Sequence, residues 1–402
     1  MSITNAYKNQ RLSAQIIEYN LNRKNIPEFR SRQSHCHFSI NGLAQLVEMW
    51  KKPGAIRAYF KNLQTCGSVW SCNVCAMKIS EYRKNEIAKL IKKAHAAGKY
   101  IYMFTWTLPH YYHESCSKVL EKFNVSTGKM KRQQSLKTNP YFKPWSVLMK
   151  EYKNDGYVIT KEILFGQNGW HVHSHGLFIF DKKIENQLQA REDFFQVWLK
   201  ACDLTFMLAD SPDHILRAFI KRSFRLDHLS GDADKVISEY LTKSGVVKKE
   251  KELKEWKLEH EMTKGHLKKS ESGLITPFGI LDKIRQLDDP NSKQSKVLKQ
   301  KFFEYTQALK GSSFVRFSPN LRSKYEIEWK SDEDIAQGET DLLNDFYGCF
   351  EVPEWKTKII KNRLRGFLLQ NSDKDWNTLV IKLNKKLKER KKNENSKTQK
   401  QH

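Results

Sequence analysis

The chain has 402 residues, of which 39% are hydrophobic and 12% aromatic. This content is enough to bury a core and to form more than one domain, so a disordered polyelectrolyte is excluded. Seventy-one Lys and Arg residues against 45 Asp and Glu residues leave a formal net charge of +26. Such a charge favours nucleic acid as a partner, because neutralising phosphates releases counterions, although a need for solubility alone is the alternative explanation.

The sequence offers no membrane-spanning or secretory segment. No apolar run approaches the ~20 residues that cross a bilayer, and the N-terminal stretch MSITNAYKNQRLSAQ lacks the apolar core of a signal peptide. We therefore expect a cytoplasmic protein without a membrane partner. Its seven cysteines are then poor candidates for disulfides.

Four of the cysteines have the spacing of a zinc site. Cys66, Cys72 and Cys75 form a Cys-x5-Cys-x2-Cys arrangement, and Cys36 in the upstream SHCHF is the candidate fourth ligand. Thiolates on a tight turn converge on a tetrahedral ion, whose binding organises a segment with little core of its own. The spacing predicts a structural zinc site, with a chance cluster of buried cysteines as the alternative. The remaining cysteines are isolated and are expected to be ordinary core or loop residues: Cys116, Cys202 and Cys349.

A helix and a strand are predicted after the cysteines. Apolar residues at helical spacing indicate a basic amphipathic helix over 81–97, which Gly98 ends. The stretch KYIYMFTWTLPH over 99–110 is rich in aromatic and β-branched residues and is stopped by Pro109, which predicts a strand. The residues up to Lys150 are expected to form a loop and a basic helix.

A β-hairpin is predicted next. Two apolar segments, 157–165 and 170–180, flank a Gln-Asn-Gly sequence at 167–169. Asn and Gly supply the left-handed backbone that a tight hairpin turn requires. Both strands are central in character, since they are apolar over most of their length.

Three histidines occupy alternate positions at the start of the second predicted strand. Because side chains alternate, His171, His173 and His175 project to one face. Same-face Cβ atoms are ~6.5 to 7 Å apart, a distance that two imidazoles bridge to one metal ion and that three in line would strain. We expect two histidines to bind a metal with a third ligand from a neighbouring strand, for which Glu162, nearly opposite, is the candidate. A structural histidine cluster is the alternative.

A candidate nucleophile follows in the helix predicted over 232–245, DADKVISEYLTKSG. Tyr240 shares a face with Val236, and Lys243 lies further along the helix. A metal with open positions polarises a phosphoryl oxygen. Tyrosine suits a phosphodiester because the resulting phosphotyrosine retains the bond energy for a later attack by a hydroxyl. Core packing is the default role of a single tyrosine, so only its context favours the catalytic role.

The remaining segments are predicted to form helices, and none of them carries a helicase motif. No Gly-rich phosphate loop followed by Lys-Ser or Lys-Thr is present, so we expect the chain to lack a helicase activity of its own. A disordered tail is expected from about Asn393. The predicted helices are an amphipathic one over 182–204, a charged one over 248–269, one over 276–284 that begins at a proline, and basic ones over 355–370 and 376–392.

Three motifs in chain order resemble those of the HUH endonucleases: FTWTLPH, GWHVHSHGLFIF and EYLTKSG. The nearer likeness is to the rolling-circle replication initiator (Rep) proteins of small plasmids, whose second motif typically reads Gly-Trp-His-Pro-His-x-His. CGSVWSCNVCAMKI resembles the Cys-rich segment of these proteins, and EMTKGHLKKSESGLITPFGIL with FFEYTQALKGSSFVRFSPNLR resembles their C-terminal half. The resemblance covers residues 36–322, and the ordered set is more specific than any one motif.

The resemblance implies a metal-dependent nicking-joining endonuclease that initiates plasmid replication. The metal-binding histidines of the family correspond to His173 and His175, with His171 in the leading position, and its nucleophile corresponds to Tyr240. Such an enzyme nicks one strand at the origin, forms a 5′-phosphotyrosine, releases a priming 3′-hydroxyl and rejoins DNA at termination. Mg²⁺ or Mn²⁺ would polarise the scissile phosphate. Lys243 would lower the pKa of the phenol or contact phosphate, unless it is simply a solvated lysine.

Two positions depart from the pattern of the family. Ser174 stands where a bulky hydrophobic residue is usual, which leaves the ligand pair open between 173/175 and 171/173. Val236 stands where some relatives have the Glu that activates the terminating water. The terminating step therefore stays open between a water activated elsewhere and Tyr240 of a second subunit.

Together the elements predict an α+β fold, with a central antiparallel sheet, flanking helices, an N-terminal Cys-rich zinc segment and a C-terminal helical region. The implied partners are origin DNA and a host helicase, DNA polymerase and single-strand binding protein, and a homodimer is left open. A relaxase or single-tyrosine transposase of the same superfamily, or a non-catalytic DNA-binding protein, is the alternative function. The expected division is an N-terminal zinc-knuckle region over 1–98, a nicking domain over 99–250, a C-terminal DNA-binding region over 251–392 and a disordered basic tail over 393–402.

Overall fold

A computed structural model describes residues 3–22, 31–38, 44–52, 54–134, 141–203, 213–229, 273–338 and 345–398. In these residues the chain is α+β and all strand pairs are antiparallel, which confirms the predicted class. The chain divides into two compact units, one formed by residues 1–79 and 330–402 and the other by residues 80–329. None of the helices in the described ranges combines the length and the apolar character needed to cross a membrane.

The unit of residues 80–329 is built around a five-stranded sheet in the order β6-β3-β5-β4-β7. The predicted hairpin forms its centre: Gly166 pairs with Gly169 across a two-residue turn, and Gly169 has a φ of +87°. β5, the histidine strand, therefore has a neighbour on each side. The strands are β3 (Tyr100–Thr107), β4 (Asn154–Gly166), β5 (Gly169–Phe180), β6 (Phe224–Leu229) and β7 (Val315–Phe317).

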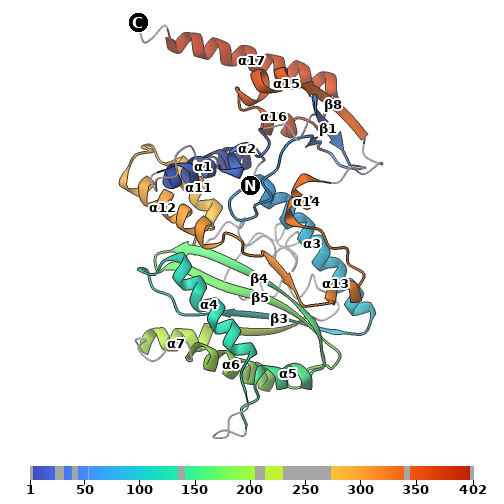
Figure 1. Ribbon diagram of the computed structural model, residues 1–402, viewed down its shortest axis with the longest axis vertical. Helices are drawn as coiled ribbons and strands as arrows, with labels where there is room; N and C mark the ends of the chain where they lie inside the picture. Colours follow the sequence, from blue (N-terminus) through green and yellow to red (C-terminus); the bar gives the residue numbers. More distant parts are fainter. Residues whose placement is uncertain are drawn as a thin grey trace. The chain divides into compact units, whose positions relative to one another are not determined.

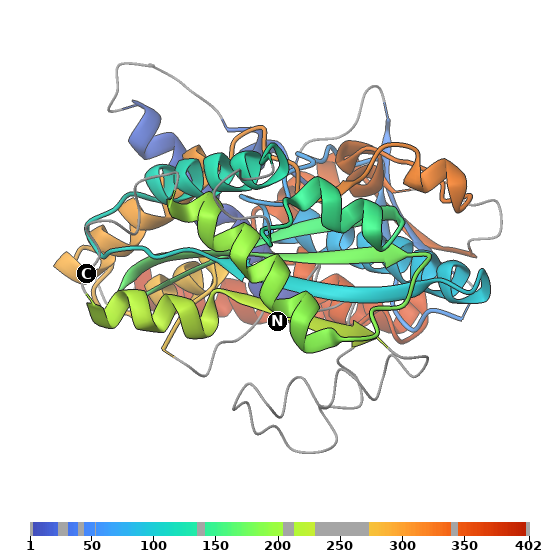
Figure 2. The same ribbon diagram turned by 90° about the horizontal axis from the view of Figure 1, so that it is seen from below.

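One face of this sheet is covered by helices that bury aromatic side chains. Figures 1 and 2 show α4 (Cys116–Lys131), α5 (Trp145–Glu151) and α6 (Gln187–Asp203) across the strands. Phe104 of β3 and Phe178 of β5 lie with ring centroids 4.3 Å apart. Burial of such rings removes a large apolar area from water in this layer. α7 (Asp213–Arg222) leads into β6.

The opposite face also carries apolar side chains, and α3 (Asn73–Ala96) packs there. Helices therefore contact both faces of the sheet. The reason is that alternate residues of β3 and β5 are apolar on both sides, so neither side can be left to water. The apolar cluster includes Ile87, Leu90, Ile91, Ala94, Ile101, Met103, Leu177 and Ile179, with Leu321 of α13 (Leu321–Lys324).

Three further elements complete this unit. α11 (Pro277–Gln286) begins at its proline as predicted, with Thr276 as the N-cap. It packs against α12 (Lys293–Ala308). β7 adds to the edge of the sheet beside β4, although the sequence predicted only helices in this region. A three-residue strand has too short a pattern to be recognised from periodicity.

The unit of residues 1–79 and 330–402 contains a smaller sheet in the order β2-β1-β8. Val47 and Phe350 are buried on its inner face, and a Cβ at Gly348 would lie 2.3 Å from Trp376, so that position requires a glycine. The other elements are helical, and the last of them continues past Asn393, where the sequence predicted the tail to begin. They are α1 (Ile3–Asn22), α2 (Arg32–His35), β1 (Leu46–Lys51), β2 (Tyr59–Lys61), α14 (Asp332–Gln337), β8 (Asp345–Glu351), α15 (Val352–Glu354), the π-helix η2 (Trp355–Ile360), α16 (Arg365–Gln370) and α17 (Trp376–Thr398).

The central hairpin provides a stability test. A Cβ at Gly169 would lie 2.9 Å from both the backbone oxygen of Tyr111 and the Cα of Tyr112, in addition to needing a positive φ. We expect Gly169→Ala to lower the free energy of unfolding by about 2–4 kcal/mol, measured by urea denaturation. Gly98→Ala is the matched control, because Gly98 has a φ of +69° but nothing within 4 Å of its Cβ position. Gly98→Ala should lower the free energy of unfolding by roughly 1–2 kcal/mol. Equal losses of stability for the two variants would contradict the steric argument.

Candidate metal centres

The four predicted zinc ligands meet in one buried group, which we call the four-cysteine group. Cys36 ends α2, Cys66 lies in the loop after β2, Cys72 directly precedes α3 and Cys75 lies in its first turn. All four are buried, and their sulfur atoms lie within 4.8 Å of one another. The Sγ of Cys36 is 3.5 Å from that of Cys75 and 3.8 Å from that of Cys72, and Cys66 and Cys75 are separated by 3.6 Å.

These separations fit a tetrahedral metal ion. Four sulfur atoms at about 2.3 Å from a central ion are about 3.8 Å from one another. The four thiols are not joined by disulfides, since their sulfur atoms are too far apart for an S–S bond. The buried four-cysteine group can therefore hold a metal such as zinc. The sequence predicted that Cys72 and Cys75 lie on a tight turn, but they lie at the start of a helix instead. Two residues three apart at the start of a helix also bring their thiols to one side.

Two cationic side chains surround the four-cysteine group. Arg365 is buried and donates hydrogen bonds to the backbone oxygens of Cys36 and His37, at 3.3 and 3.2 Å. Burial lowers the pKa of Arg365 to about 10, which leaves it protonated at neutral pH. Burial also lowers the pKa of Lys78, and the negative charge of the nearby thiolates opposes this shift. A divalent ion with four thiolates carries two negative charges, which these two cations would balance.

Metal binding would replace protons on the thiols. Burial raises the pKa of Cys72 well above its ordinary value, so this thiol is neutral at pH 7 in the absence of a metal. The pKa of Cys75 is instead lowered, because the neighbouring thiols donate hydrogen bonds to its sulfur. Four thiolates in one buried group repel one another and are stable together only with a cation between them.

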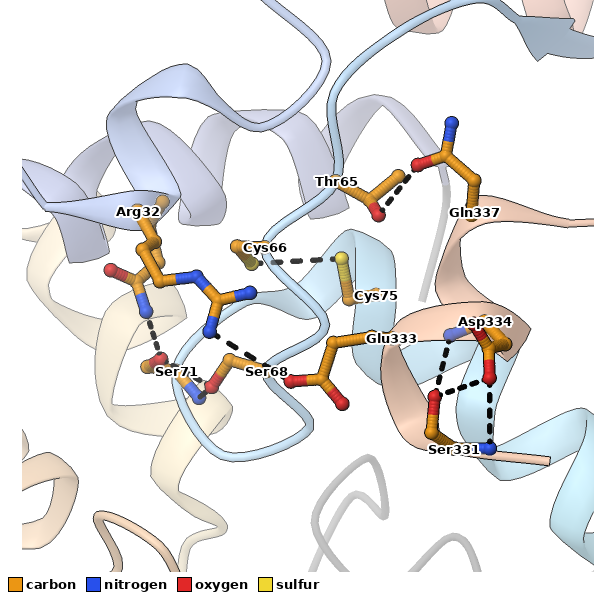
Figure 3. Close-up of polar contacts among 11 residues, drawn as sticks. Arg32, Thr65, Cys66, Ser68, Ser71, Cys75, Ser331, Glu333, Asp334 and Gln337 are labelled. Atoms are coloured by element: carbon orange, nitrogen blue, oxygen red, sulfur yellow. Dashed lines mark hydrogen bonds and ion pairs between the residues drawn. The ribbon is translucent and has the colours of Figure 1, made fainter. Parts of the chain in front are cut away.

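The four-cysteine group joins segments from both ends of the chain. Figure 3 shows the loop of Cys66 against α14. Thr65 donates a hydrogen bond of 3.1 Å to the side chain of Gln337. Gly67 lies so close to Glu333 that a Cβ would be 2.9 Å from its Cγ, and its φ is +63°. A metal in this position would therefore stabilise the contact between the N-terminal and C-terminal segments of this unit.

Zinc content tests the first centre. We expect the purified protein to contain one equivalent of zinc, and we expect Cys72→Ser to lose it and to melt at a lower temperature, because metal binding contributes to folding. Elemental analysis and thermal denaturation measure the two effects. Cys349→Ser is the control, since Cys349 is only partly buried and lies outside the group. Zinc retained in Cys72→Ser, or absent from a well-folded wild-type protein, would refute the site.

A second group lies on the central sheet and combines two histidines with a carboxylate. Glu162 of β4 pairs directly with His173 of β5, as the hairpin predicted. Glu162, His173 and His175 each offer a ligand atom, and these atoms lie within 4.8 Å of one another. The Oε2 atom of Glu162 is hydrogen-bonded to Nε2 of His173 and is 3.4 Å from Nε2 of His175. Two imidazoles and one carboxylate form a donor set suited to a divalent ion.

The surroundings orient this group and leave part of it unsatisfied. Thr105 of β3 lies with its Oγ1 3.1 Å from Nδ1 of His175, which directs Nε2 toward Glu162. In the described part of the chain, Oε1 of Glu162 is buried without a hydrogen-bond partner. Burial raises the pKa of Glu162, but His173 and His175 outweigh it and hold the pKa well below its usual value. An ionised carboxylate with an unsatisfied buried oxygen favours a further ligand, such as a metal ion.

His171 lies beside this group but outside it. Its ring meets that of His110 with centroids 4.9 Å apart, and it is not one of the three clustered ligands. Burial lowers the pKa of His171 to about 3, so its imidazole is neutral. The sequence left two histidine pairs open as metal ligands. Of these, the structure brings together His173 and His175 with Glu162. His110 was not singled out from the sequence, although it ends the predicted strand over 99–110.

The predicted nucleophile is not part of this geometry. Tyr240 and Lys243 lie outside the described residues, as does Val236. Their proposed roles therefore remain predictions from the sequence.

Comparisons with known proteins do not assign the chain to a family. No family model, no curated protein and no solved structure matches it.

Manganese affinity tests the second centre. We expect His173→Gln and His175→Gln each to weaken Mn²⁺ binding at least about tenfold, because each removes one of three protein ligands. Electron paramagnetic resonance of unbound Mn²⁺ measures this directly. His171→Gln is the matched control, with an affinity within about twofold of the wild type. A larger loss in His171→Gln than in His175→Gln would assign the metal to the other histidine pair.

Proposed function

We propose that the protein is a metal-dependent DNA nicking-joining endonuclease that initiates rolling-circle replication of a plasmid. The observation that carries this proposal is the convergence of His173, His175 and Glu162 on one face of an antiparallel sheet. A metal held by these side chains would bind and polarise a phosphate. The motifs FTWTLPH, GWHVHSHGLFIF and EYLTKSG, in that order, support the same function through their resemblance to the HUH endonucleases.

The position of the histidines along β5 keeps them clear of the helix that covers the same face of the sheet. α3 packs against Leu177 and Ile179 at one end of the histidine face, whereas His173 and His175 occupy the other end of β5. The side chain of His173 is 13% exposed. Ligands held on two paired central strands keep their geometry while a polymer approaches.

The reaction that we propose exchanges one phosphodiester for another. The phenol of Tyr240 loses its proton as its oxygen attacks the phosphorus, the bond to the 3′-oxygen breaks, and that oxygen takes up a proton to become the priming 3′-hydroxyl. The DNA 5′-phosphate remains bound to Tyr240. Attack by a 3′-hydroxyl reverses the step and rejoins the strand. Lys243 would stabilise the phenolate or contact the phosphate.

The charge of the chain supports DNA as the substrate. A net charge of +26 attracts the phosphate backbone and makes binding dependent on salt. The absence of a phosphate-loop motif from the sequence means that unwinding would come from a host helicase, with a host polymerase and single-strand binding protein as further partners.

Covalent trapping tests the activity. Purified protein is incubated with labelled single-stranded oligonucleotides from its own plasmid in Mn²⁺, and a DNA adduct that survives denaturant is sought. We expect an adduct with the wild type and none with Tyr240→Phe, because the phosphotyrosine cannot form without the phenol oxygen. His175→Gln should lower the yield by at least about tenfold through loss of a metal ligand.

Tyr141→Phe is the matched control for this experiment. Tyr141 is 89% exposed and lies outside both metal centres, so its adduct yield should equal that of the wild type. Tight binding without an adduct for any plasmid fragment would instead identify a non-catalytic DNA-binding protein. An adduct that persists in Tyr240→Phe would assign the nucleophile to another residue.

A further inference from the structure

The outer face of the small β2-β1-β8 sheet carries a row of aromatic side chains. Trp50 of β1 pairs with Tyr59 of β2 on one side and with Phe346 of β8 on the other. Residues directly opposite each other in an antiparallel sheet project from the same face. The rings of Trp50 and Phe346 are in edge contact, with centroids 5.4 Å apart. The row therefore crosses all three strands.

The two faces of this sheet differ in burial. Val47, Met49, Phe60 and Phe350 are buried on the inner face, which packs against helical residues of the same unit. On the outer face Phe346 is 56% exposed, and Trp50 and Tyr59 are only partly buried. A row of rings in water is costly unless it has a ligand or partner, because an aromatic side chain buries a large apolar area when it is covered.

Basic side chains surround the aromatic row. The ammonium group of Lys61 lies 4.9 Å from the centre of the Trp50 ring. Lys52 and Arg57 are exposed in the turn that connects β1 and β2, at the end of the sheet where the row lies. These cations would meet a partner with negative charges spaced along a chain.

Acidic residues near the aromatic row do not cancel its positive charge. Glu48 accepts a hydrogen bond of 2.8 Å from the indole nitrogen of Trp50 and lies 3.9 Å from Nζ of Lys61, so its charge is already compensated. Asp345 pairs in register with Lys51 at the end of the sheet. Beyond these pairs, Lys52 and Arg57 are exposed cations at the end of the sheet where the row lies.

We propose that Trp50, Tyr59 and Phe346 form a stacking surface for single-stranded DNA. Each ring would stack on a base, and Lys61 and Arg57 would contact the phosphates between them. Single-stranded DNA is favoured over a duplex because paired bases hide the faces that stack on aromatic rings. It is favoured over an acidic peptide because rings repeated across adjacent strands match the repeated bases of a nucleic acid. The surface goes beyond the proposed nicking activity and does not depend on it.

Binding of a short oligo-dT strand to the full-length protein tests the surface. Oligo-dT has no origin sequence, and fluorescence anisotropy without added divalent metal reads binding independently of nicking. We expect the double variant Trp50→Ala, Phe346→Ala to bind about tenfold or more weakly than the wild type, from the loss of two stacking contacts. Lys61→Gln should reduce the slope of log affinity against log salt by about one contact.

Matched variants distinguish stacking from general damage. Trp329 is 64% exposed and belongs to the other compact unit, so Trp329→Ala should bind within about twofold of the wild type. Phe346→Tyr should bind as the wild type does, because it keeps an aromatic face, whereas Phe346→Leu should bind more weakly. Unchanged oligo-dT binding by the folded double variant would overturn the proposal. Equal losses for oligo-dT and a short duplex would also overturn it, since a duplex offers no base faces.

Crosslinking provides a second measurement that does not rely on substitutions. Oligo-dT that carries a photoreactive iodouracil is irradiated with the wild-type protein, and the crosslinked peptides are identified by mass spectrometry. We expect peptides that contain Trp50 or Phe346. Crosslinks confined to residues 80–329 would refute the surface while leaving the proposed nicking activity intact.

Discussion

The alternation of side chains along β5 is the constraint on which the central unit depends. β5 is paired on both edges, so it cannot rotate or shift without breaking two ladders of hydrogen bonds. One face of the strand supplies Phe178 to the aromatic layer under α4, α5 and α6. The other face begins with histidines and continues with Leu177 and Ile179 under α3. A shift by one residue would bury the histidines in the aromatic layer, so the same register that forms the core also orients the candidate metal ligands.

The second unit depends on a different kind of constraint. Its elements are short, and it combines residues 1–79 with residues 330–402. The four-cysteine group gathers Cys36, Cys66, Cys72 and Cys75 at a place where Arg365 from the C-terminal segment contacts the backbone beside Cys36. A metal with four thiolates would fix several short segments together, where an apolar core alone would be small. The first unit thus rests on one large apolar core, whereas the second contains a buried group that could hold a metal such as zinc.

Sequence reasoning succeeded where a pattern is local. The hairpin followed from Asn168 and Gly169, and the pairing of Glu162 with His173 followed from counting outward from that turn. The grouping of the four cysteines followed from their spacing, because cysteines this close in sequence are typical of a metal site. The start of α3 was placed too late, since the sequence around Cys72 and Cys75 indicates a loop as well as it indicates the first turn of a helix. β7 and β8 were missed because short strands are defined by the partner that they pair with.

The sequence by itself therefore determined the α+β class, the central hairpin, the grouping of the four cysteines and the basic character of the chain, because each rests on spacing or composition. Only the tertiary structure decided that helices pack on both faces of the sheet and that His175 rather than His171 joins Glu162. It also decided that β8 completes a sheet with β1, which aligns Trp50 and Phe346. These features depend on contacts between residues far apart in the chain, and such contacts are set by packing and hydrogen bonding of whole elements, which no local pattern encodes.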